Sequence, residues 1–259
     1  ECMAAGAYRL VTDPEILKEA PSYWRNNYCT IDIATIDEKA EEIRDLTAKY
    51  GLEINALATY LESSDKKEKI EKCMIAAAKM GCSRIRVNAH KYNKDLGYTN
   101  VFADAVRGFE MVQDLARKYG VKADFELHHG TITAAASSAR RLASYFDPKY
   151  IGVIYDTGNI IYEGFEEYQL ALEVLGPYLD LVHIKNAKWI KKEVDGKETW
   201  MADWAPFTDG HADFPRFFKA LKKVGYDGYV TFEDFSSEET SEQKLKNNLT
   251  FIKGIVDSI

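Results

Sequence analysis

A glycine-centred junction occurs four times in this 259-residue chain and limits the folds that the chain can adopt. At each junction a helical stretch ends in lysine and one apolar residue, glycine follows, and the chain then enters a strand-like segment. The junctions are residues 48–54, 78–85, 117–123 and 222–229. Glycine adopts the left-handed conformation that ends a helix and turns the chain. The repetition predicts a unit of helix and strand that is used many times.

Short apolar segments alternate with the helical stretches and are predicted to be strands. Residues 28–35 are either one such strand or part of a long loop, and residues 102–119 have apolar side chains at helical spacing. Helix starts are predicted at Asp65 with Glu68, Thr240 with Gln243, and Asp213 with Pro215. The seven remaining predicted strands are residues 1–6, 53–59, 84–89, 122–128, 151–156, 180–185 and 228–233.

Parallel strands that alternate with helices over about 250 residues predict an α/β fold, the (β/α)8 TIM barrel. We expect residues 1–259 to form a single domain, with a first βα unit, in residues 1–36, that is incomplete or divergent. A doubly wound open sheet is the alternative, but no Gly-x-Gly-x-x-Gly turn follows a predicted strand.

A long interruption at residues 186–212 carries Trp189, Trp200 and Trp204 among charged residues. We predict a loop there. Tryptophans in a loop that follows a strand suit a lid over a site. The alternative is a surface excursion whose aromatic side chains hold it against the barrel rim.

Composition excludes several classes of protein. The net charge is −7, which argues against a nucleic-acid partner. No apolar run approaches the ~20 residues of a membrane span. Four scattered cysteines argue against a disulfide scaffold and favour a cytoplasmic location. The chain begins at Glu1, inside a predicted strand, so we expect upstream residues to have been removed or to be missing. The sequence therefore neither shows nor excludes a signal peptide.

Four polar residues lie at or near the carboxyl ends of four different predicted strands. Side chains alternate along a strand, and each of these residues has the parity that faces into the barrel. They are Glu126, Asp156, His183 and Glu233. Three acids and an imidazole at the carboxyl edge of a barrel would need a cation between them. One divalent metal ion is therefore predicted, with Mn²⁺ expected first and Mg²⁺, Co²⁺ or Zn²⁺ as alternatives. The other interpretation of each acid is a salt bridge at the rim or a helix cap.

The histidines support a site at the same edge. Each one lies at the end of a predicted strand or in the loop beyond it. They are His90, His128, His129, His183 and His211.

Four stretches resemble the xylose-isomerase-like sugar (phosphate) isomerases and epimerases. They are residues 125–131, 154–159, 181–186 and 225–233, and the likeness runs from about residue 37 to the end of the chain. The resemblance implies a (β/α)8 fold with the metal on Glu126, Asp156, His183 and Glu233. It also implies that Glu126 and Glu233 act as catalytic acid and base.

Several further residues are predicted to contact the substrate. The resemblance implies this for Lys185 and for His128 and His129. Asn159 stands where many members of the family have histidine. For Lys185 the alternative is an ion pair with a neighbouring carboxylate. Arg86 faces inward on its strand, and Trp189 and His211 lie in or beside the predicted loop.

The resemblance implies an isomerase or epimerase of carbohydrate metabolism. It would act on a sugar, sugar phosphate or related hydroxy-ketone, by proton transfer through a metal-bound enediolate. A metal-dependent dehydratase and a non-catalytic sugar-binding barrel are alternatives, and an endonuclease is disfavoured by the acidic charge. We expect no membrane partner, and a homo-oligomer is compatible with the fold.

Overall fold

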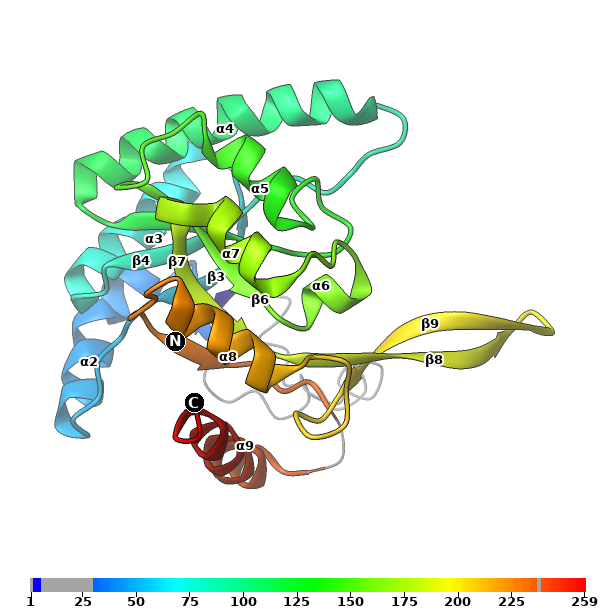
Figure 1. The fold of residues 1–259 in the computed structure, drawn as a ribbon. Helices are drawn as coiled ribbons and strands as arrows, with labels where there is room; N and C mark the ends of the chain where they lie inside the picture. The colour runs from blue at the N-terminus through cyan, green and yellow to red at the C-terminus, as the bar shows by residue number, and fades with distance from the viewer. Residues whose placement is uncertain (1, 6–29, 237–238) are drawn as a thin grey trace. The chain divides into compact units, whose positions relative to one another are not determined.

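The computed structural model describes residues 2–5, 30–236 and 239–259, and it shows the repeated alternation of helix and strand (Figure 1). The junction glycines Gly51, Gly81, Gly120 and Gly225 all have φ between 67° and 73°. Side chains with a Cβ rarely adopt this conformation, so glycine is required where each helix turns into the next segment. The predicted repeat is therefore confirmed in the backbone.

Two compact units divide the chain. The first comprises residues 1–126 and 141–153, and the second comprises residues 127–140 and 154–259. Helix α5 (Ala136–Ala143) and strand β6 (Ile151–Asp156) contribute to both units. The expectation of a single domain remains a prediction.

The first unit is a parallel sheet with three long helices. Its strands lie in the order β5-β4-β3-β1-β2, and α2 packs against α3, which packs against α4. The strands are β1 (Cys2–Ala5), β2 (Ile31–Asp32), β3 (Leu57–Glu62), β4 (Arg84–Asn88) and β5 (Lys122–Glu126). The helices are α2 (Ile36–Lys49), α3 (Lys67–Met80) and α4 (Gly97–Tyr119).

The second unit contains the strand order β10-β7-β6, and β10 pairs with β7 in parallel. Its further strands are β7 (Leu179–Ile184), β8 (Asn186–Val194), β9 (Lys197–Ala205) and β10 (Val230–Phe232). Its helices are α6 (Asn159–Tyr162), α7 (Tyr168–Leu175), a 3₁₀ turn (Gly176–Tyr178), α8 (Phe214–Lys223) and α9 (Ser241–Val256). None of the helices in the described part of the chain is long and apolar enough to span a membrane.

Strand positions agree with the sequence prediction within a few residues, with one clear correction. The strand predicted at 53–59 is β3, which starts at Leu57 and continues to Glu62 because Leu61 and Glu62 pair with β4. The segment 28–35 contributes only the two residues of β2. Residues 28 and 29 of that prediction, and residues 1 and 6 of the first predicted strand, lie outside the described residues.

Helices begin within two residues of all three predicted starts. Thr240 and Gln243 form a capping box, and Asp213 caps α8 by accepting from the Arg216 N–H. Helix α3 begins at Lys67, two residues after Asp65, but it has no side-chain cap. The Asp65 carboxylate instead accepts from the Glu62 N–H at 2.9 Å, so it closes the turn that follows β3.

Aromatic side chains form much of each core. In the first unit the ring centroid of Phe109 lies 5.3 Å from that of Phe125 and 5.9 Å from that of Phe146. In the second unit Tyr155 stacks on Phe217 at 5.2 Å. Phe125 and Tyr155 point away from the strand face that carries the predicted polar residues, as the alternation of side chains requires.

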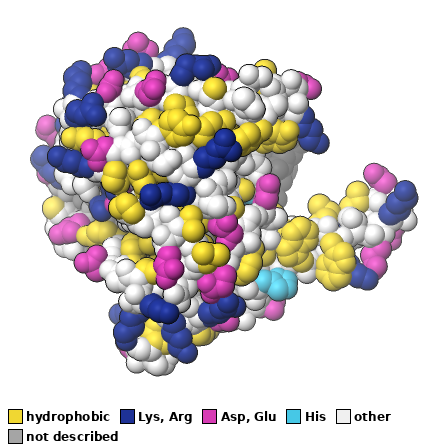
Figure 2. All heavy atoms as spheres, turned by 45° about the horizontal axis from the view of Figure 1, so that its top comes forward, with side chains coloured by type: hydrophobic (Ala, Val, Ile, Leu, Met, Phe, Trp, Pro, Cys, Tyr) yellow, Lys and Arg dark blue, Asp and Glu magenta, His cyan; other side chains and the backbone are white. Residues whose placement is uncertain are grey.

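Residues 186–205 are not the predicted loop but a two-stranded antiparallel ribbon, β8–β9. The turn residues Asp195 and Gly196 have φ of 52° and 72°, and positive φ at both central positions is the requirement of the tight hairpin turn that joins antiparallel strands. The sequence signal was therefore Asp-Gly between two strand-like segments. The ribbon contacts α6 at its base, and its far end projects as an arm (Figures 1 and 2).

Candidate functional site

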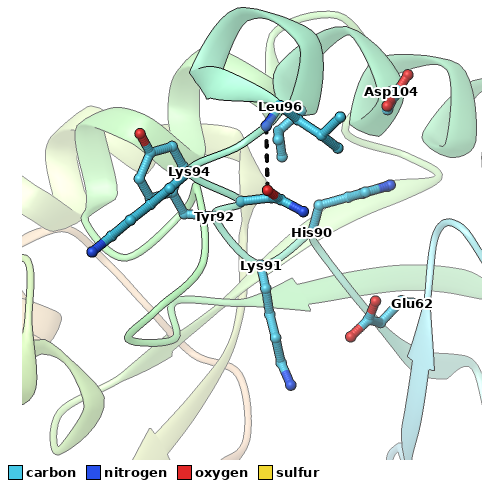
Figure 3. A pocket seen from close by; sticks show the side chains of 9 residues that line it. Glu62, His90, Lys91, Tyr92, Lys94, Leu96 and Asp104 are labelled. Atoms are coloured by element: carbon cyan, nitrogen blue, oxygen red, sulfur yellow. Dashed lines mark hydrogen bonds between the residues drawn. The ribbon is translucent and has the colours of Figure 1, made fainter.

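A polar pocket of about 410 Å³ lies at the carboxyl ends of β3 and β4 in the first unit (Figure 3). His90 lines it together with Glu62 and Asp104, and the His90 Nδ1 lies 3.2 Å from the Ser63 hydroxyl. Burial lowers the pKa of His90. His90 was predicted to stand beyond a strand, and this pocket is where the structure places it.

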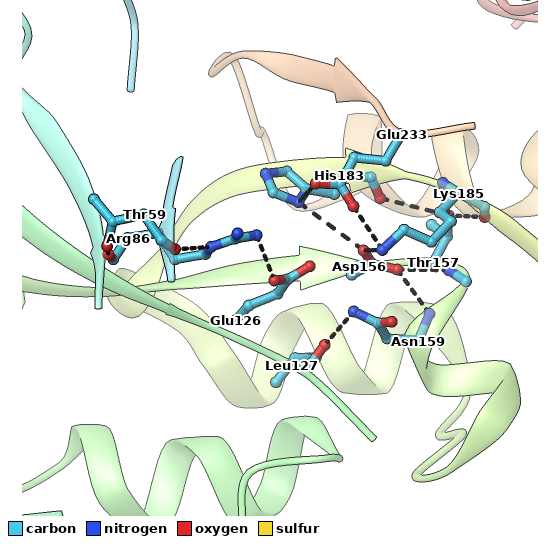
Figure 4. A network of polar contacts seen from close by, with 11 residues as sticks. Thr59, Arg86, Glu126, Leu127, Asp156, Thr157, Asn159, His183, Lys185 and Glu233 are labelled. Atoms are coloured by element: carbon cyan, nitrogen blue, oxygen red, sulfur yellow. Dashed lines mark hydrogen bonds and ion pairs between the residues drawn. The ribbon is translucent and has the colours of Figure 1, made fainter. Parts of the chain in front are cut away.

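Glu126 ends β5 in the same unit and is held by Arg86 of β4 (Figure 4). The Arg86 Nη1 donates to the Glu126 Oε2 at 2.8 Å, and its Nε donates to the Thr59 carbonyl at 3.0 Å. Both side chains of this ion pair are buried. Arg86 therefore orients the carboxylate of Glu126 through a charge-assisted hydrogen bond.

Asp156 ends β6 and is fully buried. Its Oδ1 accepts from the Gly158 N–H at 2.8 Å and from the Asn159 N–H at 2.7 Å. The backbone directly after β6 therefore holds the Asp156 carboxylate in place. The Oδ2 is left to face the side chains of β7 and β10.

His183 of β7 and Glu233, directly after β10, face the Asp156 Oδ2. The His183 Nδ1 lies 3.9 Å from that oxygen and 3.5 Å from the Glu233 Oε1. The Glu233 N–H donates to the Ile184 carbonyl at 2.9 Å, so the pairing of the two strands sets the position of Glu233. His183 is fully buried, whereas Glu233 is partly open.

Lys185 places its ammonium between the two carboxylates (Figure 4). The Nζ lies 2.9 Å from the Asp156 Oδ2 and 2.6 Å from the Glu233 Oε2. Of the two interpretations that the sequence left open, the structure shows the ion pair. Gly158 makes room for this side chain, because a Cβ at Gly158 would lie 2.7 Å from the Lys185 Cγ.

Aromatic rings enclose the Lys185 ammonium on its other sides. The Nζ lies 5.0 Å from the ring centroid of Trp204 and 4.7 Å from that of Phe235. Trp204 also packs on Tyr162, with centroids 4.5 Å apart. Tyr162 and Phe235 were not predicted as site residues, and the signal that could have found Phe235 is its place two residues after Glu233.

His128 and His129 follow β5 and join this aromatic group. The ring of His129 is stacked between His128, at 4.3 Å, and Tyr162, at 4.6 Å. Burial, together with the charges of His128 and Lys185, lowers the pKa of His129 to about 4. His129 is therefore neutral near pH 7. The His128 Nδ1 donates to the His129 carbonyl at 2.8 Å.

The remaining predicted contacts occupy two places. Asn159 is buried, and its Nδ2 donates to the Leu127 carbonyl at 3.1 Å, which ties the end of β6 to the segment after β5. Trp189 lies at the base of the ribbon, where its Nε1 donates to the Ile161 carbonyl at 2.8 Å. The His211 Nδ1 accepts from the Trp189 N–H at 3.2 Å.

Three of these side chains in the second unit could hold a metal ion. Asp156, His183 and Glu233 each offer one ligand atom, and these atoms lie within 4.8 Å of one another. Two carboxylates and an imidazole are a donor set that suits hard and borderline divalent cations. The buried carboxylate of Asp156 and the partly open one of Glu233 also need positive charge nearby, which Lys185 supplies in this structure. The residues present therefore fit a divalent cation.

Comparison with known proteins agrees with this fold. Inosose dehydratase of Geobacillus kaustophilus (strain HTA426) is 27% identical over 135 residues, which are 49% of this chain and 44% of that protein. The chain thus spans less than half the length of this curated relative.

Solved structures show the same fold. The apo structure of 3-keto-D-glucoside 4-epimerase from E. coli has a TM-score of 0.68 at 17% identity, over 90% of this chain and 94% of the other. A xylose isomerase-like TIM barrel protein from Mycobacterium smegmatis, in complex with magnesium, has a TM-score of 0.68 at 18% identity. The match covers 99% of this chain and 96% of that protein.

The family match is longer than the likeness seen in the sequence motifs, because it begins at residue 22 rather than near residue 37 and ends at residue 255. It includes all four stretches on which the resemblance rests. The chain belongs to the xylose isomerase-like TIM barrel family.

Proposed function

We propose that the protein is a divalent-metal-dependent isomerase or epimerase of a sugar or a related hydroxy-ketone. The observation that carries the proposal is the set of Asp156, His183 and Glu233 at the carboxyl ends of neighbouring strands. Sites in TIM barrels lie at this edge. The family match and the likeness to a sugar epimerase fold support the same chemistry.

Glu126 is proposed as the fourth metal ligand. It precedes Leu127, whose N–H donates to the Ile154 carbonyl at 3.0 Å, two residues before Asp156. The covalent chain therefore keeps Glu126 close to the end of β6. Mn²⁺ is the cation that we expect, with Mg²⁺, Co²⁺ and Zn²⁺ as alternatives. Such an ion would polarise a carbonyl group and make the neighbouring C–H bond more acidic.

The chain's own carboxylates would move the proton. Glu233 is the more open of the buried acids and would remove the proton from the carbon next to the carbonyl. Glu126, held by Arg86, would return a proton to the other face of that carbon or to its neighbour. Lys185 would stabilise the negative charge that develops on the substrate oxygen.

Substrate contacts are proposed for the residues that surround these acids. Neutral His129 can donate to or accept from a sugar hydroxyl, and the Trp204 ring offers a surface for the C–H face of a sugar. The full proposed set is His128, His129, Lys185, Asn159, Arg86, Trp189 and His211.

A dehydratase is the second candidate, favoured by the 27% identity to inosose dehydratase over about half of this chain. The first step would be the same removal of a proton by a carboxylate. Loss of hydroxide from the neighbouring carbon would then follow, and the expelled oxygen would leave as water after it takes up a proton. Isomers and epimers have the mass of the substrate, whereas a dehydrated product is lighter by one water.

The first test is metal content in protein purified without added metal or chelator, followed by Mn²⁺ titration. We expect about one divalent ion per chain, and weaker binding in Asp156→Asn but not in the exposed ribbon control Asp203→Asn. A ketose panel in heavy water would then show deuterium uptake at the carbon next to the carbonyl. If wild type neither contains nor binds a divalent metal, both enzyme proposals are wrong, and a sugar-binding barrel would remain.

A further inference from the structure

Apart from Trp189, the large apolar side chains that the β8–β9 ribbon exposes are not used by the proposed function. Trp200 is 59% exposed, and Trp189, Val194 and Met201 are each more than 40% exposed. Figure 2 shows apolar side chains gathered along this arm, with lysines and acids towards its end. Clustered exposed apolar side chains mark a surface that another molecule covers.

Both faces of the ribbon carry such side chains. The cross-strand pairing places Trp189, Trp200 and Trp204 on one face, and Ile190, Val194 and Met201 on the other. In the described part of the chain, β8 and β9 pair only with each other. Each strand therefore has one edge whose backbone N–H and C=O groups form no hydrogen bonds to a third strand. Another strand can pair with an edge of this kind.

We propose that β9 pairs in antiparallel orientation with β9 of a second copy of this chain, with the two-fold axis at Trp200. In this register Lys197 of each copy lies opposite Asp203 of the other, and Thr199 lies opposite Met201. Opposite charges directly across a strand pair are favourable. A two-fold contact of this kind uses the same surface on both copies and closes at a dimer.

Charge favours a second copy as the occupant. The ribbon contains four lysines and four acids, so its net charge is zero, although the whole chain carries −7. Two ribbons therefore meet without net repulsion. The outer edge of β8 is partly occupied at its base, because the His211 N–H donates to the Ala187 carbonyl at 2.8 Å and the Trp189 N–H donates to the His211 Nδ1 at 3.2 Å. The β9 edge is therefore the preferred one.

The base of the ribbon is anchored, so the free edge is presented in a preformed geometry. Trp189 donates to the Ile161 carbonyl, and Trp204 packs on Tyr162. Along the ribbon, Lys191 pairs with Glu198 at 2.7 Å and Lys192 with Asp203 at 2.8 Å. An interface element that is already ordered loses less conformational entropy on association. This inference does not depend on the proposed enzymatic activity.

The first test is the molar mass in solution by light scattering, over about a hundredfold range of concentration. We expect the wild type to form dimers and Trp200→Glu to raise the dissociation constant at least about tenfold. Tyr50→Glu, at an exposed apolar position on the other unit, is the matched control and should dimerise as wild type does. A monomeric wild type, or a Trp200→Glu protein that dimerises like wild type, would overturn the proposal.

A cross-link tests the register itself. Residues directly opposite each other in an antiparallel pair have Cα atoms about 4.5–5.5 Å apart, which a disulfide can bridge. Trp200→Cys should therefore give a covalent dimer on mild oxidation. Lys191 lies opposite Trp200 on β8 and is also exposed, so Lys191→Cys is the control and should remain monomeric on denaturing gels. Efficient cross-linking through Lys191→Cys instead of Trp200→Cys would contradict pairing through β9.

Discussion

The cluster around Lys185 and the β8–β9 ribbon both depart from the usual pattern of apolar side chains inside and charged side chains outside. The cluster places charged groups inside, and the ribbon places apolar groups outside. The cluster buries an ammonium, two carboxylates and an imidazole, whereas the ribbon exposes tryptophan, valine and methionine. Charged groups are rarely buried unless they are paired, and large apolar patches are rarely exposed unless they are covered. Each region is therefore explained by the ligand or partner that we propose for it.

The two regions differ in what holds them in place. Each acid of the cluster is fixed by the backbone, as when Glu233 follows β10 with its N–H bonded to Ile184. Each residue of the outer ribbon, 191–200, is exposed, and this part relies on cross-strand pairs and ion pairs at its surface. We therefore expect substitutions in the cluster to change chemistry and stability, and those in the ribbon to change association.

The largest expected effect is on turnover. Glu233→Gln removes the proposed base but keeps the shape of the side chain, so the exchange of substrate protons with solvent should fall by about 10²–10⁴-fold. The measurement is deuterium uptake from heavy water by the ketose that the wild type turns over. Glu193→Gln, on the exposed ribbon, is the control and should keep full activity. Full activity in Glu233→Gln with metal bound would refute the two-carboxylate scheme.

A double-mutant cycle compares a buried ion pair with an exposed one. Asp156→Ala leaves the Lys185 ammonium short of one of its two carboxylates, and loss of one partner of a buried pair costs about 3–5 kcal/mol of unfolding free energy. Adding Lys185→Met should restore part of this loss. The ribbon pair, Lys192 with Asp203, should show a coupling below about 1 kcal/mol.

Urea denaturation in the presence of a chelator measures all of these variants. Equal coupling energies in the two pairs would mean that burial does not distinguish the cluster from the ribbon.

Sequence reasoning located the cluster better than the ribbon, for a physical reason. The alternation of side chains along β6 and β7 fixes which residues share a face, so Asp156 and His183 could be placed from the sequence alone. The Lys185 ion pair remained open, because only coordinates decide between two partners of a long side chain.

The ribbon was missed because, among the residues that the structure describes, its strands pair only with each other, and they carry apolar residues on both faces. They therefore lack the one-sided alternation of a strand that packs on a core. Asp195-Gly196 was a turn signal, but charged residues on both sides made the segment resemble a loop. Tyr162 and Phe235 reach Trp204 only through tertiary packing, which a local pattern does not report.

Lys185 and a metal ion compete for the same two carboxylates. In Lys185→Met that competing charge is absent, so Mn²⁺ should bind at least about tenfold more tightly, equivalent to ~1.4 kcal/mol. Calorimetric titration of apoprotein measures the change. Lys192→Met on the ribbon is the control and should bind Mn²⁺ as wild type does. Weaker binding in Lys185→Met would show that the ammonium supports the metal site rather than competes with it.

His129 should make the stability of the second unit depend on pH. Its folded pKa is about 4, below the ordinary value near 6.5, so the unfolded state takes up a proton first as pH falls. The stabilisation is complete above about pH 6.5 and is lost progressively down to about pH 4. His129→Gln should flatten this part of the curve measured by urea denaturation with chelator present. An unchanged slope would mean that His129 titrates normally.

The smallest expected effect distinguishes the two ends of the ribbon. Trp204 contacts Tyr162, Phe235 and Lys185, so Trp204→Ala should destabilise the monomer, whereas Trp200→Ala should change its unfolding free energy by less than about 0.5 kcal/mol. At high protein concentration Trp200→Ala should also become destabilising, because association stabilises the folded wild type by mass action. Thermal unfolding at two concentrations measures both effects. If Trp200→Ala loses the same stability at both concentrations, Trp200 contributes to folding of the monomer. If it loses no stability at either concentration, the exposed face of β9 has no role in association.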